Sequence, residues 1–396
     1  MKSVEKTKKR RRRTTGKFLY SQHFIKLTDI FSLYGVGIVT ARDKLTIHFN
    51  KEQAFQLVSD FSSYAGKEEL SRNYFNLGKD TRDWKLKNAQ QDIIESNIDI
   101  DRIVPILYRP FDIRYTYYTG KTRGFICMPR LSVMSHMLRE NIGLITAHQV
   151  SEGDYSHCFV ADTIIDSRLI TMRRGISYIF PLYKYNYSLK KKPRAFNIGF
   201  INPNVSIPMI TNINPTVFTR LHKIFGFDNP VSARQIFYYI YAILNSGIYR
   251  KLYREQLKID FPHIPFTPDF DLFIRLSSLG EGLAAIHKMK SWELMQTFSK
   301  FEITGYNLVE DPHFKPSAGE TGRVYINDSQ YFSNISKELW DFQVCGYQIL
   351  KKWLRERLDR ILTPVEVRYF IEICRALQLT SQYRDRIDGL YSQLEI

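Results

Sequence analysis

Apolar and polar positions change their spacing along this chain, and the change predicts two lobes. Before about residue 212, short apolar runs are separated by turn residues, which predicts strands with a few helices. Beyond it, apolar residues recur at spacings of three and four, as on the buried face of a helix. A length of 396 residues also favours two lobes, since a domain takes roughly 150 residues. We therefore expect an α+β fold, with a mixed-sheet lobe at residues 18–212 and a mainly helical lobe at residues 213–396.

The first lobe carries its apolar residues in short β-branched and aromatic runs. Tyr34–Phe49 predicts a strand, a turn at Arg42–Asp43 and a second strand. Helical spacing follows at residues 51–70 and again at residues 83–96. Further strands are expected at residues 103–107, 114–118, 141–150, 157–161 and 177–182. This order predicts a lobe built on sheets, with its helices near the start.

The second lobe contains clear signals for where helices begin and end. Ser232, with Gln235 three positions later, predicts a capping box before an apolar run. Pro262 and Pro265 enforce an extended segment, because proline cannot continue a helix. Further helices are expected at residues 271–291, 337–362 and 365–377, with a hairpin near residues 323–331. These helices are expected to frame the first lobe.

Two strand-like segments of the first lobe have similar sequences. Gly37–Asp43 reads GIVTARD and Gly143–Gln149 reads GLITAHQ. The similarity is either a chance agreement of two ordinary strands or a duplicated unit that presents side chains on equivalent edges. Only in the second case are Arg42, His148 and Gln149 natural base readers, since glutamine can contact adenine and arginine can contact guanine.

Charge adds a class of partner to this picture. Lysine and arginine outnumber aspartate and glutamate by 57 to 40, a net charge of +17 that favours a polyanion. Residues 2–17 hold nine bases and one acid, so we expect residues 1–17 to be a disordered basic tail that binds any polyanion by counterion release. The tail lacks the apolar core of a signal peptide, and no run of about 18 apolar residues occurs, so we expect an intracellular protein without membrane segments.

The stretch from Asp101 to Arg130 interleaves bases with aromatic residues. Its bases are Arg102, Arg109, Arg114, Lys121, Arg123 and Arg130, and its rings include Tyr108, Phe111, Tyr115, Tyr117, Tyr118 and Phe125. Guanidinium groups pair with phosphate or guanine and flat rings stack on sugars and bases, so this composition favours nucleic acid. The alternative is a tyrosine-rich strand with a solvated basic face.

The residues that we predict to contact DNA share a cationic, amide or aromatic side chain placed at a strand end or in a loop. They are Arg42, Lys44, Arg109, Arg114, Tyr115, Tyr117, Tyr118, Lys121, Arg123, His148, Gln149, Arg168, Lys191 and Lys192. Lys191 and Lys192 belong to Lys184–Arg194, a basic loop without acids that is also a plausible linker.

Motifs of catalysis are not found in the sequence. Amino-methylation of a base needs a Pro-Pro turn, and the fifteen prolines include no such pair. Gly120-Lys121-Thr122 lacks the upstream glycine of a phosphate loop, because Tyr115 occupies that position. The four cysteines are far apart and form no CxxC pair, so we expect reduced, mostly buried thiols and neither a zinc site nor disulfides. We therefore expect no catalytic residue, cofactor or metal site in this chain.

Several ordered blocks of the chain carry a family resemblance. They are Gly35–His48, Asn76–Lys85, Ile103–Phe125, Gly143–Gln149, Phe237–Pro265 and Asp341–Trp353. Together they resemble the C-terminal specificity region of type ISP restriction-modification enzymes, from about residue 18 to residue 377. The run from Tyr241 to Ser246 and the later Pro262-x-Ile-Pro265 segment are also similar to target-recognition parts of related single-chain enzymes. Two positions differ from the family, with His148 and His263 where arginine is common.

The resemblance implies a noncatalytic domain that recognises a sequence in double-stranded DNA. Adenine methylation and restriction would be carried out by methyltransferase, helicase and nuclease domains, which would use S-adenosylmethionine, ATP and magnesium, in the bacterial cytoplasm. Two alternatives stay open at this point. The chain could itself act as an adenine DNA methyltransferase, or it could be a nonspecific nucleic-acid-binding protein that depends on Lys8–Arg13.

Overall fold

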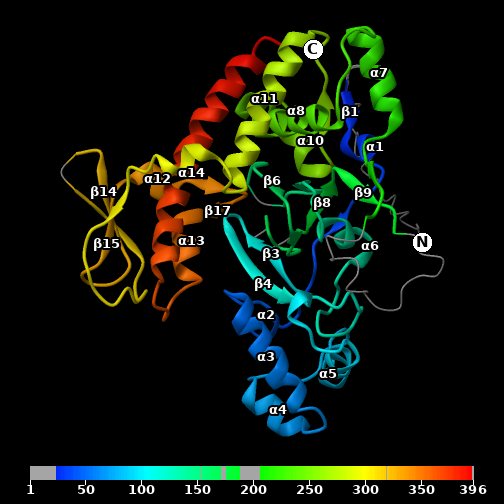
Figure 1. Ribbon diagram of the computed structural model, residues 1–396. Helices are drawn as coiled ribbons and strands as arrows, with labels where there is room; N and C mark the ends of the chain where they lie inside the picture. The colour runs from blue at the N-terminus through cyan, green and yellow to red at the C-terminus, as the bar shows by residue number, and fades with distance from the viewer. Residues whose placement is uncertain (1–23, 152, 171–174, 188–205, 318, 395–396) are drawn as a thin grey trace, which may run out of the picture.

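The computed structural model describes residues 24–151, 153–170, 175–187, 206–317 and 319–394. It has the predicted α+β architecture, with two central sheets, a group of long helices above them and a small sheet that projects to one side (Figure 1). The predicted basic tail, residues 1–17, and the loop residues Lys191 and Lys192 lie outside the described residues.

Two sheets form the centre of the first lobe. One is four-stranded in the order β2 (Gly35–Val36), β8 (Ser177–Pro181), β5 (Gly143–Ala147), β6 (Cys158–Ala161), with antiparallel neighbours. The other has the order β4 (Asp112–Tyr117), β3 (Ile103–Arg109), β7 (Ile164–Ile165). Every residue of β5 and β6 is buried, as expected for strands covered on both faces. The strands predicted from their apolar runs are therefore confirmed.

Four helices of the first lobe lie beyond the end of the β3–β4 hairpin (Figure 1). They are α2 (Asp43–Thr46), α3 (Lys51–Ser63), α4 (Glu68–Tyr74) and α5 (Leu86–Glu95). The second strand predicted within Tyr34–Phe49 is wrong, because Asp43–Thr46 forms a helical turn and only His48 bridges to a strand, at Tyr115. The helix predicted at residues 51–70 ends at Ser63, and a second helix begins at Glu68.

Long helices dominate the second lobe. They are α7 (Pro215–Phe225), α8 (Ala233–Asn245), α11 (Phe270–His287) and α14 (Pro364–Tyr391), with the shorter α9 (Gly247–Leu252) and α10 (Arg254–Ile259) between them. The predicted capping box is confirmed, since the Ser232 hydroxyl accepts from the Gln235 backbone N–H at 3.2 Å. Helices α8 and α11 approach closely at Gly280, where an added Cβ would lie 1.9 Å from the Tyr238 carbonyl oxygen.

A four-stranded antiparallel sheet projects from the second lobe (Figure 1). We call it the small sheet, and its order is β12 (Lys300–Phe301), β15 (Tyr331–Ser336), β14 (Thr321–Tyr325), β13 (His313–Pro316). The predicted hairpin near residues 323–331 is its β14–β15 pair. The helix expected at residues 337–362 is divided into α12 (Lys337–Asp341) and α13 (Ile349–Arg355) by the hairpin of β16 (Gln343–Val344) and β17 (Tyr347–Gln348).

The two lobes share one continuous core. The first described strand, β1 (Phe24–Lys26), pairs with β11 (His263–Pro265), so the start of the chain is joined to the helical lobe. At the expected boundary, Asn212 is fully buried, and its amide donates to the Leu33 and Pro181 carbonyl oxygens at 2.7 Å each. The chain therefore passes from one predicted lobe to the other inside packed structure.

Candidate nucleic-acid interface

Three segments of the first lobe that carry cations contact one another. They are the loop into α2 together with the first turn of α2, the loop that joins α4 to α5, and the loop after β4. We call the set of their cations the loop surface, and its members are Arg42, Lys44, Lys79, Arg82, Lys121 and Arg123. Lys44, Lys79, Arg82 and Arg123 are exposed, whereas Arg42 and Lys121 are half-buried. The structure thus brings together four of the predicted residues, Arg42, Lys44, Lys121 and Arg123, with two that were not predicted.

Trp84 anchors these three loops to one another. Its side chain is fully buried, and its indole N–H donates to the Phe125 carbonyl oxygen at 3.2 Å. The Arg42 guanidinium lies 4.9 Å from the centre of the indole ring and donates to the Lys79 carbonyl oxygen at 2.8 Å. Because each segment contacts this ring or a neighbour of it, the relative positions of the three segments are fixed by packing.

Asp83 orients two of the guanidinium groups on the loop surface. Its carboxylate accepts from Arg82 at 2.8 Å and from Arg123 at 3.1 Å, while the two arginine side chains remain 90% and 60% exposed. The hydrogen bond from Arg82, and then the charges of both arginines, lower the pKa of Asp83, so this carboxylate is ionised at neutral pH. A guanidinium has five N–H donors, so each arginine retains donors for phosphate or for the edge of guanine.

The loop after β4 has a constrained conformation. Asp92 is buried and accepts from the Thr119 hydroxyl and the Phe125 backbone N–H, both at 2.8 Å, and burial raises its pKa. A Cβ on Gly124 would lie 2.1 Å from this carboxylate, so glycine is required there. Arg123 has a φ of 60° and Ala41 a φ of 65°. Each such residue costs about 1–3 kcal/mol and this strain is typical of functional sites.

Arg109 and Arg114 must be withdrawn from the predicted interface. Arg109 forms an ion pair with Asp166 at 2.8 Å, and its side chain is only 12% exposed. Arg114 donates to Asp112 at 2.7 Å and to Glu356 at 3.1 Å, and its side chain is 7% exposed. Both guanidinium groups are directed into the protein because carboxylates inside it hold them.

Two of the predicted tyrosines are also interior residues. Tyr117 is buried and its hydroxyl lies 2.8 Å from the Ser96 hydroxyl, while Tyr118 donates to the Pro129 carbonyl oxygen at 2.7 Å. Their hydroxyl groups therefore satisfy internal hydrogen bonds, and we withdraw both residues as well. Tyr115 is half-buried, and its backbone pairs with that of His48, so its role in DNA contact stays a prediction.

His148 and Gln149 lie away from the loop surface, at the end of β5. The His148 Nε2 atom is 3.2 Å from an Asp260 carboxylate oxygen, and the Gln149 amide donates to the Ile259 carbonyl oxygen at 3.5 Å. Lys26 also binds Asp260, at 2.6 Å. His148 and Gln149 thus contact the end of α10, and DNA contact by this pair stays a prediction.

The similarity between residues 37–43 and residues 143–149 does not correspond to equivalent positions. Strands β2 and β5 flank β8, and Gly35 and Ile145 both pair with Ile179. This register sets Gly37 level with Ala147 on the opposite side of β8, whereas equivalent positions would set it level with Gly143. The chain from Gly37 also leaves the strand for α2, so Arg42 and His148 occupy different surroundings.

One predicted residue remains to be placed, and three residues near the loop surface were not predicted. Arg168 is exposed, and its contact with DNA stays a prediction. Sequence reasoning missed Lys79, Arg82 and Trp84, although residues 79–87 carry four bases among nine positions. The interleaving of those bases with Asp80 and Asp83 concealed the signal, because it favours a solvated helix start.

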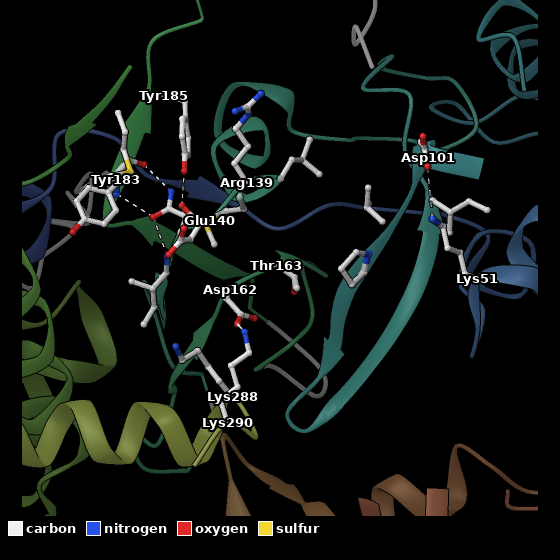
Figure 2. Close-up of a pocket in the computed structure, with 18 of the residues that line it drawn as sticks. Lys51, Asp101, Arg139, Glu140, Asp162, Thr163, Tyr183, Tyr185, Lys288 and Lys290 are labelled. Atoms are coloured by element: carbon white, nitrogen blue, oxygen red, sulfur yellow. Dashed lines mark hydrogen bonds and ion pairs between the residues drawn. The ribbon is translucent and has the colours of Figure 1, made fainter. Parts of the chain in front are cut away.

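A groove with a volume of about 1400 Å³ is a different feature of the described residues. Figure 2 shows Lys51 beside Asp101 and Lys290 beside Asp162 along it, with Arg139 and Glu140 adjacent in the chain. Its opposite charges offset one another. The described lining includes no member of the loop surface, so we do not assign DNA contact to this groove.

Three further observations concern the cysteines, possible metal ligands and possible membrane-spanning helices. Cys127, Cys158, Cys345 and Cys374 are free and buried, as predicted. Across the described ranges, no three His, Cys, Asp or Glu side chains are grouped so that they could hold a metal ion. Among those same residues, no helix has the length and apolar character needed to cross a membrane.

Three solved structures share this fold over most of the chain. The Type ISP restriction-modification enzyme LlaBIII bound to DNA matches 93% of the chain with a TM-score of 0.64 and 18% identity. The DrdV–DNA complex matches 91% with a TM-score of 0.66 and 19% identity. A nuclease-deletion mutant of the Type ISP enzyme LlaGI, in complex with a DNA substrate mimic, matches 90% with a TM-score of 0.60 and 18% identity.

The chain spans only part of these proteins, namely 23% of LlaBIII, 36% of DrdV and 28% of the LlaGI mutant. A search of curated proteins finds no match. The model of the family described as the Type ISP C-terminal specificity domain matches residues 29–375. A match of that extent, together with the shared fold, shows that the chain belongs to the Type ISP C-terminal specificity domain family.

Proposed function

We propose that this chain is the target-recognition domain of a type ISP restriction-modification system and reads a sequence in double-stranded DNA. The observation that carries the proposal is the match to a specificity-domain family over residues 29–375. The DNA-bound state of the three similar structures supports the same substrate.

The loop surface supplies a chemistry that suits this role. Arg82 and Arg123 extend from one carboxylate with their guanidinium groups exposed. An oriented guanidinium can bind the O6 and N7 atoms of guanine through two N–H donors, whereas a freely rotating lysine acts mainly as a point charge on phosphate. We assign base reading to Arg123 and backbone contact to Lys44 and Lys79, whereas Lys121 is already paired with Glu95 at 2.7 Å.

The partners in this proposal are the other domains of the same system. Adenine methylation and DNA cleavage would be carried out by methyltransferase, helicase-like and nuclease domains, which would bind S-adenosylmethionine, ATP and magnesium in the bacterial cytoplasm. This chain would contribute the choice of site and no reacting group.

Selection from a randomised duplex pool tests the proposal. Both the complete chain and a form without residues 1–17 should enrich the same sequence, because the folded part reads the bases. A form without residues 1–17 that binds every duplex equally would favour a nonspecific binder driven by the tail.

Calorimetry with S-adenosylmethionine tests the division of labour. We expect no heat of binding when the methyl donor is titrated into this chain alone. Micromolar binding, followed by methyl transfer to duplex DNA, would instead assign the methyltransferase activity to this chain.

A further inference from the structure

The outward surface of the small sheet repeats one arrangement of side chains on neighbouring strands. Lys315 of β13 lies 4.6 Å from the centre of the Tyr325 ring on β14. Arg323 of β14 lies 4.5 Å from the centre of the Tyr331 ring on β15. Each cation is thus fixed over a tyrosine of the next strand, and we call this surface the cation–tyrosine face.

The rings beneath these cations form a continuous row across three strands. His313 stacks on Tyr325 with ring centres 5.3 Å apart and an angle of 7° between the planes. The ring centres of Tyr325 and Tyr331 are 5.0 Å apart. Their backbones are paired in the same row, His313 with Tyr325 and Tyr325 with Tyr331. The row gives the two cations a rigid support.

The positions of the two cations do not favour the stability of the sheet. Lys315 and Arg323 are directly opposite each other on β13 and β14, and like charges in this relation destabilise a sheet. Neither forms an ion pair with a carboxylate of the described residues. Asp311 contacts His313, and Glu302 accepts from Ser333 and acts on Arg323 through its charge, without a salt bridge to it.

An irregularity of the sheet coincides with Arg323. The pairing of β14 with β15 shifts between Gly322 and Val324, and on the partner strand Asn334 has a φ of 58°. Bulges of this kind redirect a side chain, and they are common beside functional sites. Here the irregularity lies next to the cation of the central β14 strand, in a sheet that projects away from the rest of the molecule (Figure 1).

We propose that the cation–tyrosine face is a second DNA contact, in which Lys315 and Arg323 bind the phosphate backbone of duplex DNA outside the bases read by the loop surface. This inference rests on the proposed function and adds a separate surface to it. Two exposed cations without a salt bridge, on adjacent strands, complement the closely spaced phosphates of a duplex. Contacts of this kind with the backbone carry no sequence information, so the face adds affinity and no sequence preference.

Fluorescence anisotropy with a labelled 40-base-pair duplex of mixed sequence tests the inference on the complete chain. The double variant Lys315→Ala/Arg323→Ala should bind this duplex roughly tenfold more weakly at physiological salt. Its logarithmic salt dependence should be shallower by about 2, one step of about 0.9 for each lost phosphate contact. The sequence enriched from a random duplex pool should stay the same.

Lys337→Ala is the matched control, because it removes one cation beside the same sheet that is already paired with Asp341. It should leave both the affinity and the salt dependence unchanged. Thermal unfolding should show that the double variant, which changes only exposed side chains, is folded. A glutamine pair, Lys315→Gln/Arg323→Gln, should give the same loss of affinity as the alanine pair.

Unchanged duplex affinity in both double variants would overturn the inference. The same titrations with labelled polyglutamate separate the two polyanions, and a loss confined to polyglutamate would assign the face to an acidic protein. The two proposals can fail separately. If no sequence is enriched from the pool but the double variant still weakens duplex binding, the proposed reading function fails and the phosphate contact stands.

Discussion

Asp112 and Asp83 each bind two arginines, yet they belong to regions with opposite roles. Asp112 is 2% exposed and pairs with Arg114 at 2.7 Å and with Arg357 at 3.0 Å, which joins the β3–β4 hairpin to the helical lobe. The Asp83 side chain is 24% exposed, and its arginines extend into solvent. An aspartate with two arginines thus joins two parts of the interior in one region and presents guanidinium N–H donors to solvent in the other.

The difference shows that the contacts an arginine makes besides its aspartate decide whether it lies inside the protein or faces solvent. Around Arg114, further charges come from the other lobe, with Glu356 at 3.1 Å and Arg357 and Arg360 near the same Phe49 ring. Around Arg82 and Arg123, the corresponding space is solvent. Both regions are rich in basic and aromatic residues, so composition alone does not tell which arginines are buried and which are exposed.

Removing the two carboxylates should give the largest contrast. We expect Asp112→Ala to lower the free energy of unfolding by about 3–5 kcal/mol, because two buried guanidinium groups lose a shared partner. Asp83→Ala should change the free energy of unfolding far less, since exposed ion pairs contribute little. Urea unfolding of both variants measures the contrast, and equal costs would contradict it.

Arg123→Gly should separate stability from binding on the loop surface. It should weaken binding to the selected duplex by about 1–3 kcal/mol, with relaxed preference at one base pair. The free energy of unfolding should be unchanged or up to about 1 kcal/mol higher, because glycine adopts the φ of 60° without strain. Arg123→Ala is the control, which loses the guanidinium and keeps the strain. Equal weakening on all duplex sequences would make Arg123 a phosphate contact.

Acid should destabilise the interior while the loop surface stays charged. Burial, and then the charge of Lys184, lower the pKa of His136 to about 4, and its Nδ1 atom accepts from the Tyr185 backbone N–H at 3.0 Å. The unfolded chain therefore binds this proton more readily than the folded one, and stability falls as the pH drops from about 6.5 towards 4.

Between pH 7 and pH 5 this single group should lower the free energy of unfolding by about 2 kcal/mol. Urea unfolding at a series of pH values measures the loss. His136→Asn, which keeps an acceptor near the same position and does not titrate, should flatten that part of the profile. An identical profile in the variant would show that His136 is not the group responsible.

Lys79→Ala should have the smallest effect and sharpen the division within the loop surface. As a phosphate contact it should weaken binding to every duplex alike and make the logarithmic salt dependence shallower by about 1. Anisotropy titrations at several salt concentrations measure this slope. A change of preference at a single base pair would place Lys79 among the base readers instead.

Much of the fold could be predicted from the sequence, because its signals are local. The apolar runs of β3, β5, β6 and β8 and the capping residues Ser232 and Gln235 act within a few positions of the chain. The predicted strand at residues 44–49 failed because its alternating pattern also fits one helical turn followed by a single bridge. Such short segments are decided by contacts with distant residues.

The site could be predicted only in part for the same physical reason. Arg123 and Arg114 each bind an aspartate, but the Arg114–Asp112 pair has further partners in Glu356 and Arg357, which lie more than 200 positions away in the chain. Trp84 escaped notice because its importance lies in contacts with Arg42 and Phe125 from other loops. No local pattern reports a contact of that range.

The central indole at Trp84 has a consequence for how such a domain can change its target. Three segments pack around this one buried ring, so their exposed side chains can be substituted while their backbones keep the same positions. A new binding preference can then arise by substitution of exposed residues on these segments, without a change in the packing beneath them.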